Sequence, residues 1–152
     1  MKTLSNISMT QWNWMKPSEI KIGDVFLINM NKANGVVPKP GDDNRDKYFI
    51  VLGFDGEGNI YGGVIFNSYM NMNLPPMIRL MQHPIAGESY GFLSHDSYVD
   101  CSSIKKVKKI KLLKSSYLGS LRENDINLIC DKIRRNRRIS KFELERFGLV
   151  ES

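Results

Sequence analysis

Short apolar runs, each ended by a turn signal, dominate the first two thirds of this 152-residue chain. Residues 24–29 (DVFLIN), 47–52 (KYFIVL) and 59–69 carry β-branched and aromatic side chains and are bounded by glycine or asparagine. Runs of this length and composition are typical of buried strands. The stretch 55–59 (DGEGN) tolerates positive φ angles, so it predicts a hairpin between the second and third strands.

A glycine pair interrupts the third run. Gly62 and Gly63 predict a bulge or a sharp bend, of the kind that a small barrel needs at its corners. Two shorter strands are predicted at 90–93 and 97–100. Residues 104–113 (IKKVKKIKLL) fit either a strand or a helix, and their β-branched content favours a strand.

The last part of the chain carries the start signals of two helices. Ser120 with Glu123, and Ser140 with Glu143, form capping-box patterns in which the serine hydroxyl accepts the amide three residues on. Gly148 can close the second helix. The predicted helices cover about 120–135 and 140–147. The first presents an apolar stripe to the sheet: Ile126, Ile129, Cys130 and Ile133.

Several short strands followed by helices predict a mainly β fold, a small and curled antiparallel sheet with a helical tail. The length predicts one domain, over residues 17–152, preceded by a polar N-terminal arm over 1–16. No apolar run has the length of a membrane span, and the first sixteen residues lack a secretory h-region. We therefore expect a cytoplasmic protein that does not enter a membrane.

Residue types that hold metals and cofactors are sparse. Cys101 and Cys130 lie 29 positions apart with no CxxC pattern, which argues against a disulfide scaffold and a zinc site. The sequence has neither a P-loop nor a GxGxxG motif. His83 and His95 are typical of surface or capping histidines, and the neighbours Ser94, His95 and Asp96 are too close in sequence to converge as a catalytic triad. We expect no cofactor and no metal.

Basic charge is concentrated in one segment. Twelve of the 22 Lys and Arg residues lie in the segment 105–138, against three acidic residues there. Such a concentration is the electrostatic footprint of a polyanion-binding protein, or else a solvated face that aids solubility. Four lysines at its start are the candidate contacts to a nucleic-acid backbone: Lys105, Lys106, Lys108 and Lys109.

Five stretches, in this order, resemble the MazF/PemK (Kid) family of toxin endoribonucleases. Residues 22–28 (IGDVFLI) look like its opening strand, 47–52 like its Arg-Pro-Val-Val-Val-Leu strand, and 64–68 (VIFNS) like the strand that ends in Thr-Ser. Residues 99–107 are similar to its Asp-Gln-x-Arg strand, and 117–121 (YLGSL) to the turn before its C-terminal helix. The resemblance spans about residues 20–134.

The resemblance implies an SH3-like barrel of the MazF/PemK/CcdB type, a homodimer, and cleavage of single-stranded RNA by the RNA's own 2′-OH without a metal. It also implies control by an antitoxin protein. The family's catalytic arginine falls on Lys47, with Arg45 on the same face of the strand as a substitute. The family's threonine falls on Asn67, followed by Ser68. These four residues are the candidate catalytic residues.

Two departures keep a second function open. Lys47 keeps the positive charge but lacks the bidentate fork of arginine, and Asn67 has no hydroxyl. A non-catalytic SH3-like module that binds nucleic acid or a protein partner is therefore the alternative. The methionine-rich insertion at 70–95, longer than in typical family members, is either a partner surface or a flap over one end of the core.

Overall fold

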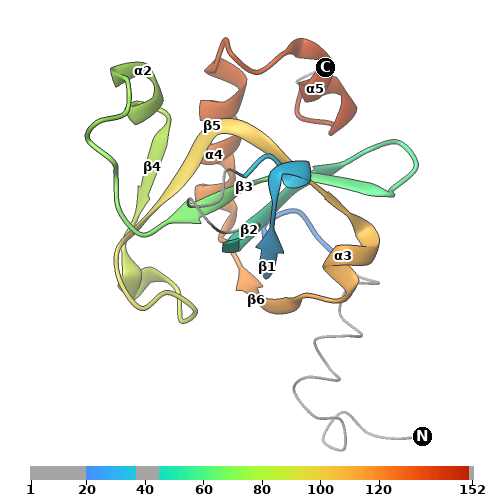
Figure 1. Ribbon diagram of the computed structural model, residues 1–152, viewed down its shortest axis with the longest axis horizontal. Helices are drawn as coiled ribbons and strands as arrows, with labels where there is room; N and C mark the ends of the chain where they lie inside the picture. The colour runs from blue at the N-terminus through green and yellow to red at the C-terminus, as the bar shows by residue number, and fades with distance from the viewer. Residues whose placement is uncertain (1–19, 37–44, 151–152) are drawn as a thin grey trace, which may run out of the picture.

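Six antiparallel strands form one strongly twisted sheet in the computed structural model, which describes residues 20–36 and 45–150 (Figure 1). The strand order across the sheet is β4-β5-β3-β2-β1-β6. The chain is thus mainly β, as the sequence predicts. The strands are β1 (Asp24–Met30), β2 (Arg45–Phe54), β3 (Ile60–Asn67), β4 (Gln82–Ile85), β5 (Ser97–Lys108) and β6 (Ser116–Ser120).

The predicted hairpin joins β2 to β3. Asp55 Oδ1 accepts hydrogen bonds from the Asn59 amide at 3.0 Å and the Ile60 amide at 3.3 Å, and these bonds shape the turn. The glycine pair lies where the register of β3 shifts against both neighbouring strands. This confirms the predicted irregularity in the third strand.

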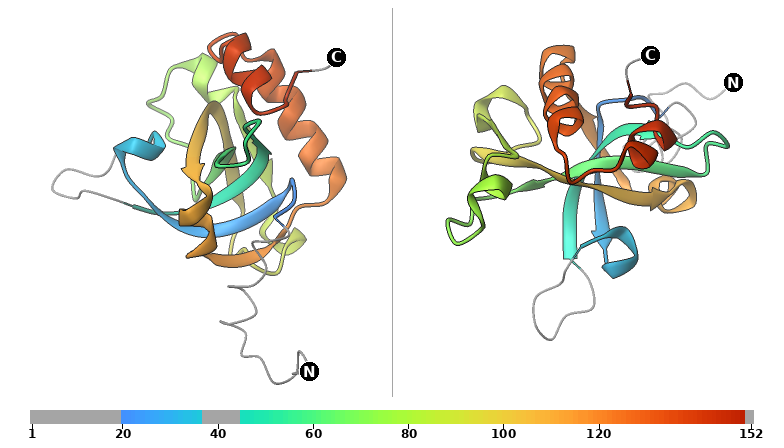
Figure 2. Two further views of the ribbon diagram at one scale, coloured as in Figure 1. Left: turned by 90° about the vertical axis from the view of Figure 1, so that its right-hand side faces the viewer. Right: turned by 90° about the horizontal axis from the view of Figure 1, so that it is seen from above.

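Side chains alternate between the two faces along each strand, so both faces of the sheet carry apolar side chains. Each face is covered by packed elements. One face packs against helix α4 (Glu123–Arg135) and helix α5 (Lys141–Arg146), and its core contains Ile50, Val64 and Ile129 (Figure 2). The other face is lined by Phe26, Phe49, Ile65 and Val107, and helix α3 (Lys109–Leu113) adds Leu112 to this core.

Phe147 explains why glycines stand in the middle of the sheet. A Cβ atom at Gly62 would lie 2.6 Å from Phe147 Cγ, and one at Gly53 would lie 1.9 Å from the Phe147 carbonyl oxygen. Only glycine allows the turn after α5 to pack this closely. The predicted cap of this helix is confirmed, since Ser140 Oγ accepts from the Glu143 amide at 3.1 Å.

The predicted cap of the longer helix is wrong. Ser120 ends strand β6, where it donates to the buried Asp24 carboxylate, and the N-cap position of α4 is Arg122. Pairing with β1 draws residues 116–120 into the sheet, so the serine is no longer available to the helix.

Two strand predictions also need correction. Residues 104–113 are a strand only as far as Lys108, and the remainder forms α3. Residues 90–93 are not a strand; they follow the 3-10 turn η4 (Gly87–Ser89) as turns and bends. The part of the insertion at 70–95 that precedes them contains helix α2 (Pro76–Arg79) and strand β4.

The predicted arm at 1–16 lies outside the described residues. Among the residues that the structure does describe, no helix is long and apolar enough to span a membrane.

Candidate functional site

Lys47 and Asn67 lie side by side across strands β2 and β3. The register pairs Phe49 with Ile65, so the next pair with the same orientation, two residues on, is Lys47 and Asn67. Lys47 Nζ donates to Asn67 Oδ1 at 2.9 Å. The structure therefore brings together the two residues that the sequence places at the mouth of the second strand and the end of the third.

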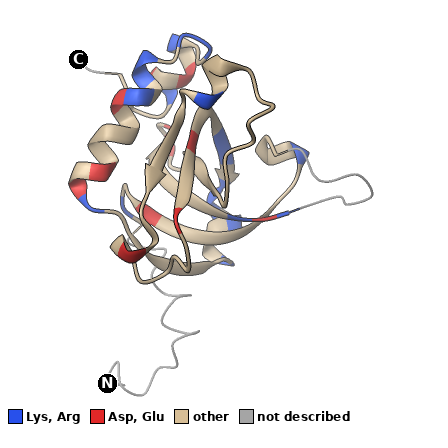
Figure 3. Cartoon of the chain, turned by 90° about the vertical axis from the view of Figure 1, so that its left-hand side faces the viewer, with Lys and Arg blue, Asp and Glu red and all other residues tan. Residues whose placement is uncertain are grey.

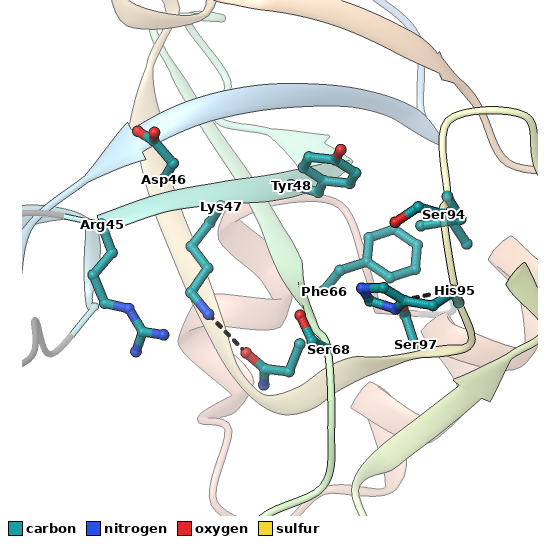
Figure 4. A pocket seen from close by; sticks show the side chains of 11 residues that line it. Arg45, Asp46, Lys47, Tyr48, Phe66, Ser68, Ser94, His95 and Ser97 are labelled. Carbon is teal, nitrogen blue, oxygen red and sulfur yellow. Dashed lines mark hydrogen bonds between the residues drawn. The ribbon is translucent and has the colours of Figure 1, made fainter.

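A hollow of about 280 Å³ surrounds this pair, and Arg45 and Ser68 line it as well (Figure 4). Arg45, Lys47 and Asn67 have the strand parity of the Phe49–Ile65 face, so both cations extend from the same side of β2. All four predicted site residues thus share one hollow. Asp46 also lines the hollow, but its side chain extends to the other side of the strand and accepts from Asn29 Nδ2 at 2.9 Å.

Aromatic packing holds residues 90–92, which follow β4, against the end of the sheet where the hollow lies. The Phe92 ring meets Tyr48 of β2 and Phe66 of β3 edge to face, each with ring centroids 6.2 Å apart, and it stacks on Tyr90 at 5.4 Å. Such pairs add stability beyond the area they bury. Tyr48 and Phe66 also form part of the wall of the hollow, so this cluster fixes the residues that follow Phe92 at its rim.

The residues that follow, Leu93 to Ser97, complete the hollow and bring His95 into it. Figure 4 shows the imidazole ring of His95 facing the same space as Ser68. Gly87 packs against the backbone of this turn: a Cβ atom there would lie 2.5 Å from the His95 carbonyl carbon. The Gly87 amide also donates to Asp96 Oδ1 at 2.8 Å, which ties η4 to the turn.

One ring nitrogen of His95 is occupied by the protein. Nδ1 lies 2.9 Å from the Asp96 carbonyl oxygen. A carbonyl oxygen only accepts, so in the neutral ring Nδ1 carries the proton and Nε2 has the lone pair. Because the Asp96 carboxylate bonds the Gly87 amide, no Ser94–His95–Asp96 relay forms, as the sequence spacing predicts.

The basic segment 105–138 is largely bonded within the protein. Seven of its twelve cations donate to a backbone oxygen, a side-chain oxygen or a carboxylate of this chain. They are Lys105, Lys106, Lys111, Arg122, Lys132, Arg134 and Arg135. Figure 3 shows Lys and Arg gathered where α4 ends and the chain turns toward α5.

The four predicted backbone-binding lysines do not lie at the hollow. Asn67 pairs with Tyr98 at one end of β5, whereas Lys108 pairs with Ile60 at the other end. Lys105 Nζ donates to the Gly35 carbonyl at 2.7 Å, and Lys106 Nζ lies 2.7 Å from Glu143 Oε1. Lys108 and Lys109 are exposed, and within the described part of the chain their ammonium groups have no hydrogen bond or ion pair, although the Lys109 amide donates to the Asn59 carbonyl at 2.8 Å.

Both cysteines are buried thiols, and burial raises the pKa of Cys101 to about 12, so this thiol is not a ready nucleophile. Within residues 20–36 and 45–150, no group of three His, Cys, Asp or Glu side chains is placed to hold a metal ion.

A scan against models of protein families finds no match for this chain, and a search of curated proteins finds none either. The family resemblance therefore stays a prediction that depends on the order of its motifs.

Sequence reasoning missed His95 as a residue of this site. In the sequence it stands 27 residues after Ser68, in a polar SHDS stretch that is typical of a surface turn. The signal that could have found it is the aromatic residue Phe92 just before this stretch, since a large apolar side chain needs a partner in the sheet.

Proposed function

We propose that this chain binds single-stranded RNA and cleaves it at internal phosphodiester bonds, with the RNA 2′-OH as nucleophile and no metal. The observation that carries the proposal is the hollow in which two cations, Arg45 and Lys47, face Asn67, Ser68 and His95. The ordered resemblance to the MazF/PemK toxins supports the same function.

The reaction needs little from the protein beyond charge, position and a base. The 2′ oxygen attacks the adjacent phosphorus, the bond from phosphorus to the 5′ oxygen breaks, and a 2′,3′-cyclic phosphate and a 5′-hydroxyl result. Arg45 and Lys47 stabilise the extra negative charge on the pentavalent phosphorane. Asn67 and Ser68 offer hydrogen bonds to its oxygens.

His95 takes the proton of the 2′-OH in this proposal. Its Nε2 carries the lone pair because Nδ1 bonds the Asp96 carbonyl. The leaving 5′ oxygen is protonated by water, which reaches this exposed site. A base positioned in this way contributes roughly 10²- to 10⁴-fold to a rate.

The finer family traits belong to the same proposal. The twisted sheet is the SH3-like barrel of the family, the chain works as a homodimer in the cytoplasm, and an antitoxin protein restrains it. A small acidic protein encoded next to this one would support the antitoxin.

The test is incubation of the purified 152-residue chain with mixed-sequence single-stranded RNA in the presence of a chelator. We expect fragments with 5′-hydroxyl and 2′,3′-cyclic phosphate ends. Replacement of the 2′-OH by 2′-O-methyl throughout the RNA should abolish cutting, because the nucleophile is lost. Intact RNA at high protein concentration would remove the enzymatic proposal.

The second candidate is a non-catalytic module on the same fold. The Lys47–Asn67 hydrogen bond favours it, because it occupies the cation with a side-chain amide where the family pattern has an arginine and a hydroxyl. A salt titration distinguishes the kinds of partner: nucleic-acid affinity falls steeply with salt, whereas binding through methionine and aromatic contacts changes little.

A further inference from the structure

A second hollow adjoins the first. It has a volume of about 220 Å³ and shares four residues with the first hollow: Arg45, Lys47, Asn67 and Ser68. Its remaining walls come from the segment directly after Ser68 (residues 69–71), from Leu74 and from Gln82 of β4. The two hollows therefore meet at the cations and diverge from them.

We propose that this second hollow is a base-binding subsite, which takes the nucleotide next to the phosphate held by Arg45 and Lys47. The inference rests on the proposed function and adds to it the path of the RNA strand through the site. If a phosphate occupies the residues that both hollows share, the chain of nucleotides continues into each, so the bound linkage is an internal one.

Tyr69 is the stacking residue of this subsite. Its side chain lines the hollow and is 75% exposed, although it directly follows Ser68. Sites for single-stranded nucleic acid combine cations that bind the phosphates with aromatic rings on which bases stack. An aromatic ring this open, next to two cations in one hollow, has that combination.

Asn71 supplies polar recognition in the same hollow. Its Oδ1 accepts from the Asn73 amide at 2.9 Å, a turn that holds the side chain in place. One lone pair of Oδ1 is used in this way, and the Nδ2 hydrogens are the donors that the side chain can offer to a ligand. Asn71 can therefore donate to an acceptor atom on the edge of a bound base.

The experiment measures the dissociation constant of a fluorescein-labelled 2′-O-methyl oligoribonucleotide, which the proposed reaction cannot cleave, by anisotropy at fixed low salt. Tyr69→Ala should raise Kd about tenfold, since a stacked base contributes that order of affinity. Tyr69→Phe keeps the ring and should stay within about twofold of the wild type. Phe142→Ala is the matched control, because Phe142 is 73% exposed on α5 and lines neither hollow.

An oligonucleotide whose bases are removed but whose backbone is intact completes the test. With it, wild type and Tyr69→Ala should bind equally. If Tyr69→Ala leaves Kd unchanged on the complete oligonucleotide while Arg45→Ala weakens binding, the subsite is wrong and the proposed function stands. If the wild-type protein neither binds nor cleaves RNA, the proposed function fails and the subsite fails with it.

Discussion

Two groups of cations in this protein differ in what surrounds them. Arg45 and Lys47 stand at the start of β2 in a hollow with polar partners; Asp46 lines it too, but its side chain extends to the other side of the strand. The segment 105–138 holds many more cations, yet most of them donate to oxygens of the chain itself. Lys47 also donates within the chain, to Asn67 Oδ1, so the two groups differ mainly in arrangement: Lys47 and Arg45 line one hollow together.

Charge density in a sequence is thus a poor guide to the charge that a ligand meets. Lys105 shows why: its ammonium group donates to Gly35 and Ser103, so it holds the segment before β2 against β5. Burial also lowers the pKa of Lys105. The cations of the hollow are few, but they converge.

The largest expected effect comes from removing a cation from the hollow. Arg45→Ala and Lys47→Ala should each lower the rate of RNA cleavage by about 10²- to 10³-fold, because each removes a group that stabilises the phosphorane. The measurement is kcat/KM on a labelled single-stranded RNA. Unchanged rates in both variants would show that neither residue stabilises the phosphorane.

The matched variants keep the charge or lie outside the hollow. Lys47→Arg should retain cleavage, since arginine keeps the charge and adds a bidentate fork. Lys109→Ala removes an exposed lysine of the basic segment and should change the rate by less than about twofold. A large loss in Lys109→Ala would reverse the ranking of the two regions.

The next effect concerns the two histidines of the chain. His95→Gln should lower kcat by about 10²-fold, because it removes the base that takes the proton of the 2′-OH. His83→Gln is the control. His83 lines neither hollow, and burial lowers its pKa, with Asp125 acting in the opposite direction. Equal kcat values for the wild type and His95→Gln would show that His95 is not the base.

The strands of the first half were predictable because their signals are local. Short apolar runs, the 55–59 turn and the glycine pair each act within a few residues, and the structure confirms all three. The Ser120 cap failed for the opposite reason. A capping box and an edge strand compete for the same serine, and pairing with β1, nearly a hundred residues away, decides the outcome.

The residues of the candidate site also differ in whether local sequence signals could predict them. Lys47 and Asn67 were predictable because a hairpin register sets them opposite each other. His95 was not, because the packing of Phe92 on Tyr48 and Phe66 brings its turn to the sheet, and no local pattern encodes that contact. Sequence patterns thus identify the strand residues of a site more readily than those that a loop adds.

A stability measurement tests whether a lysine of the basic segment has a structural role. Lys105→Met removes the ammonium group bonded to Gly35 and Ser103, and it should lower the free energy of unfolding by about 1–2 kcal/mol. Denaturant unfolding measures the change. Lys108→Met is the control, because Lys108 is exposed and should change stability by less than about 0.5 kcal/mol. Equal stabilities of the two variants would show that Lys105 is not a structural lysine.

The smallest effect tests what the exposed lysines still contribute. Lys108 and Lys109 lie at the far end of β5 from the hollow, so they can reach only a distant phosphate of a long strand. Lys108→Ala with Lys109→Ala should lower the slope of log Kd against log salt by about 0.7 for each phosphate that the double variant no longer neutralises on a long RNA. With an RNA too short to reach from the hollow to Lys108, the slope should not change. A reduced slope with the short RNA would mean that RNA binds along the basic segment itself, and the two regions would then act as one surface.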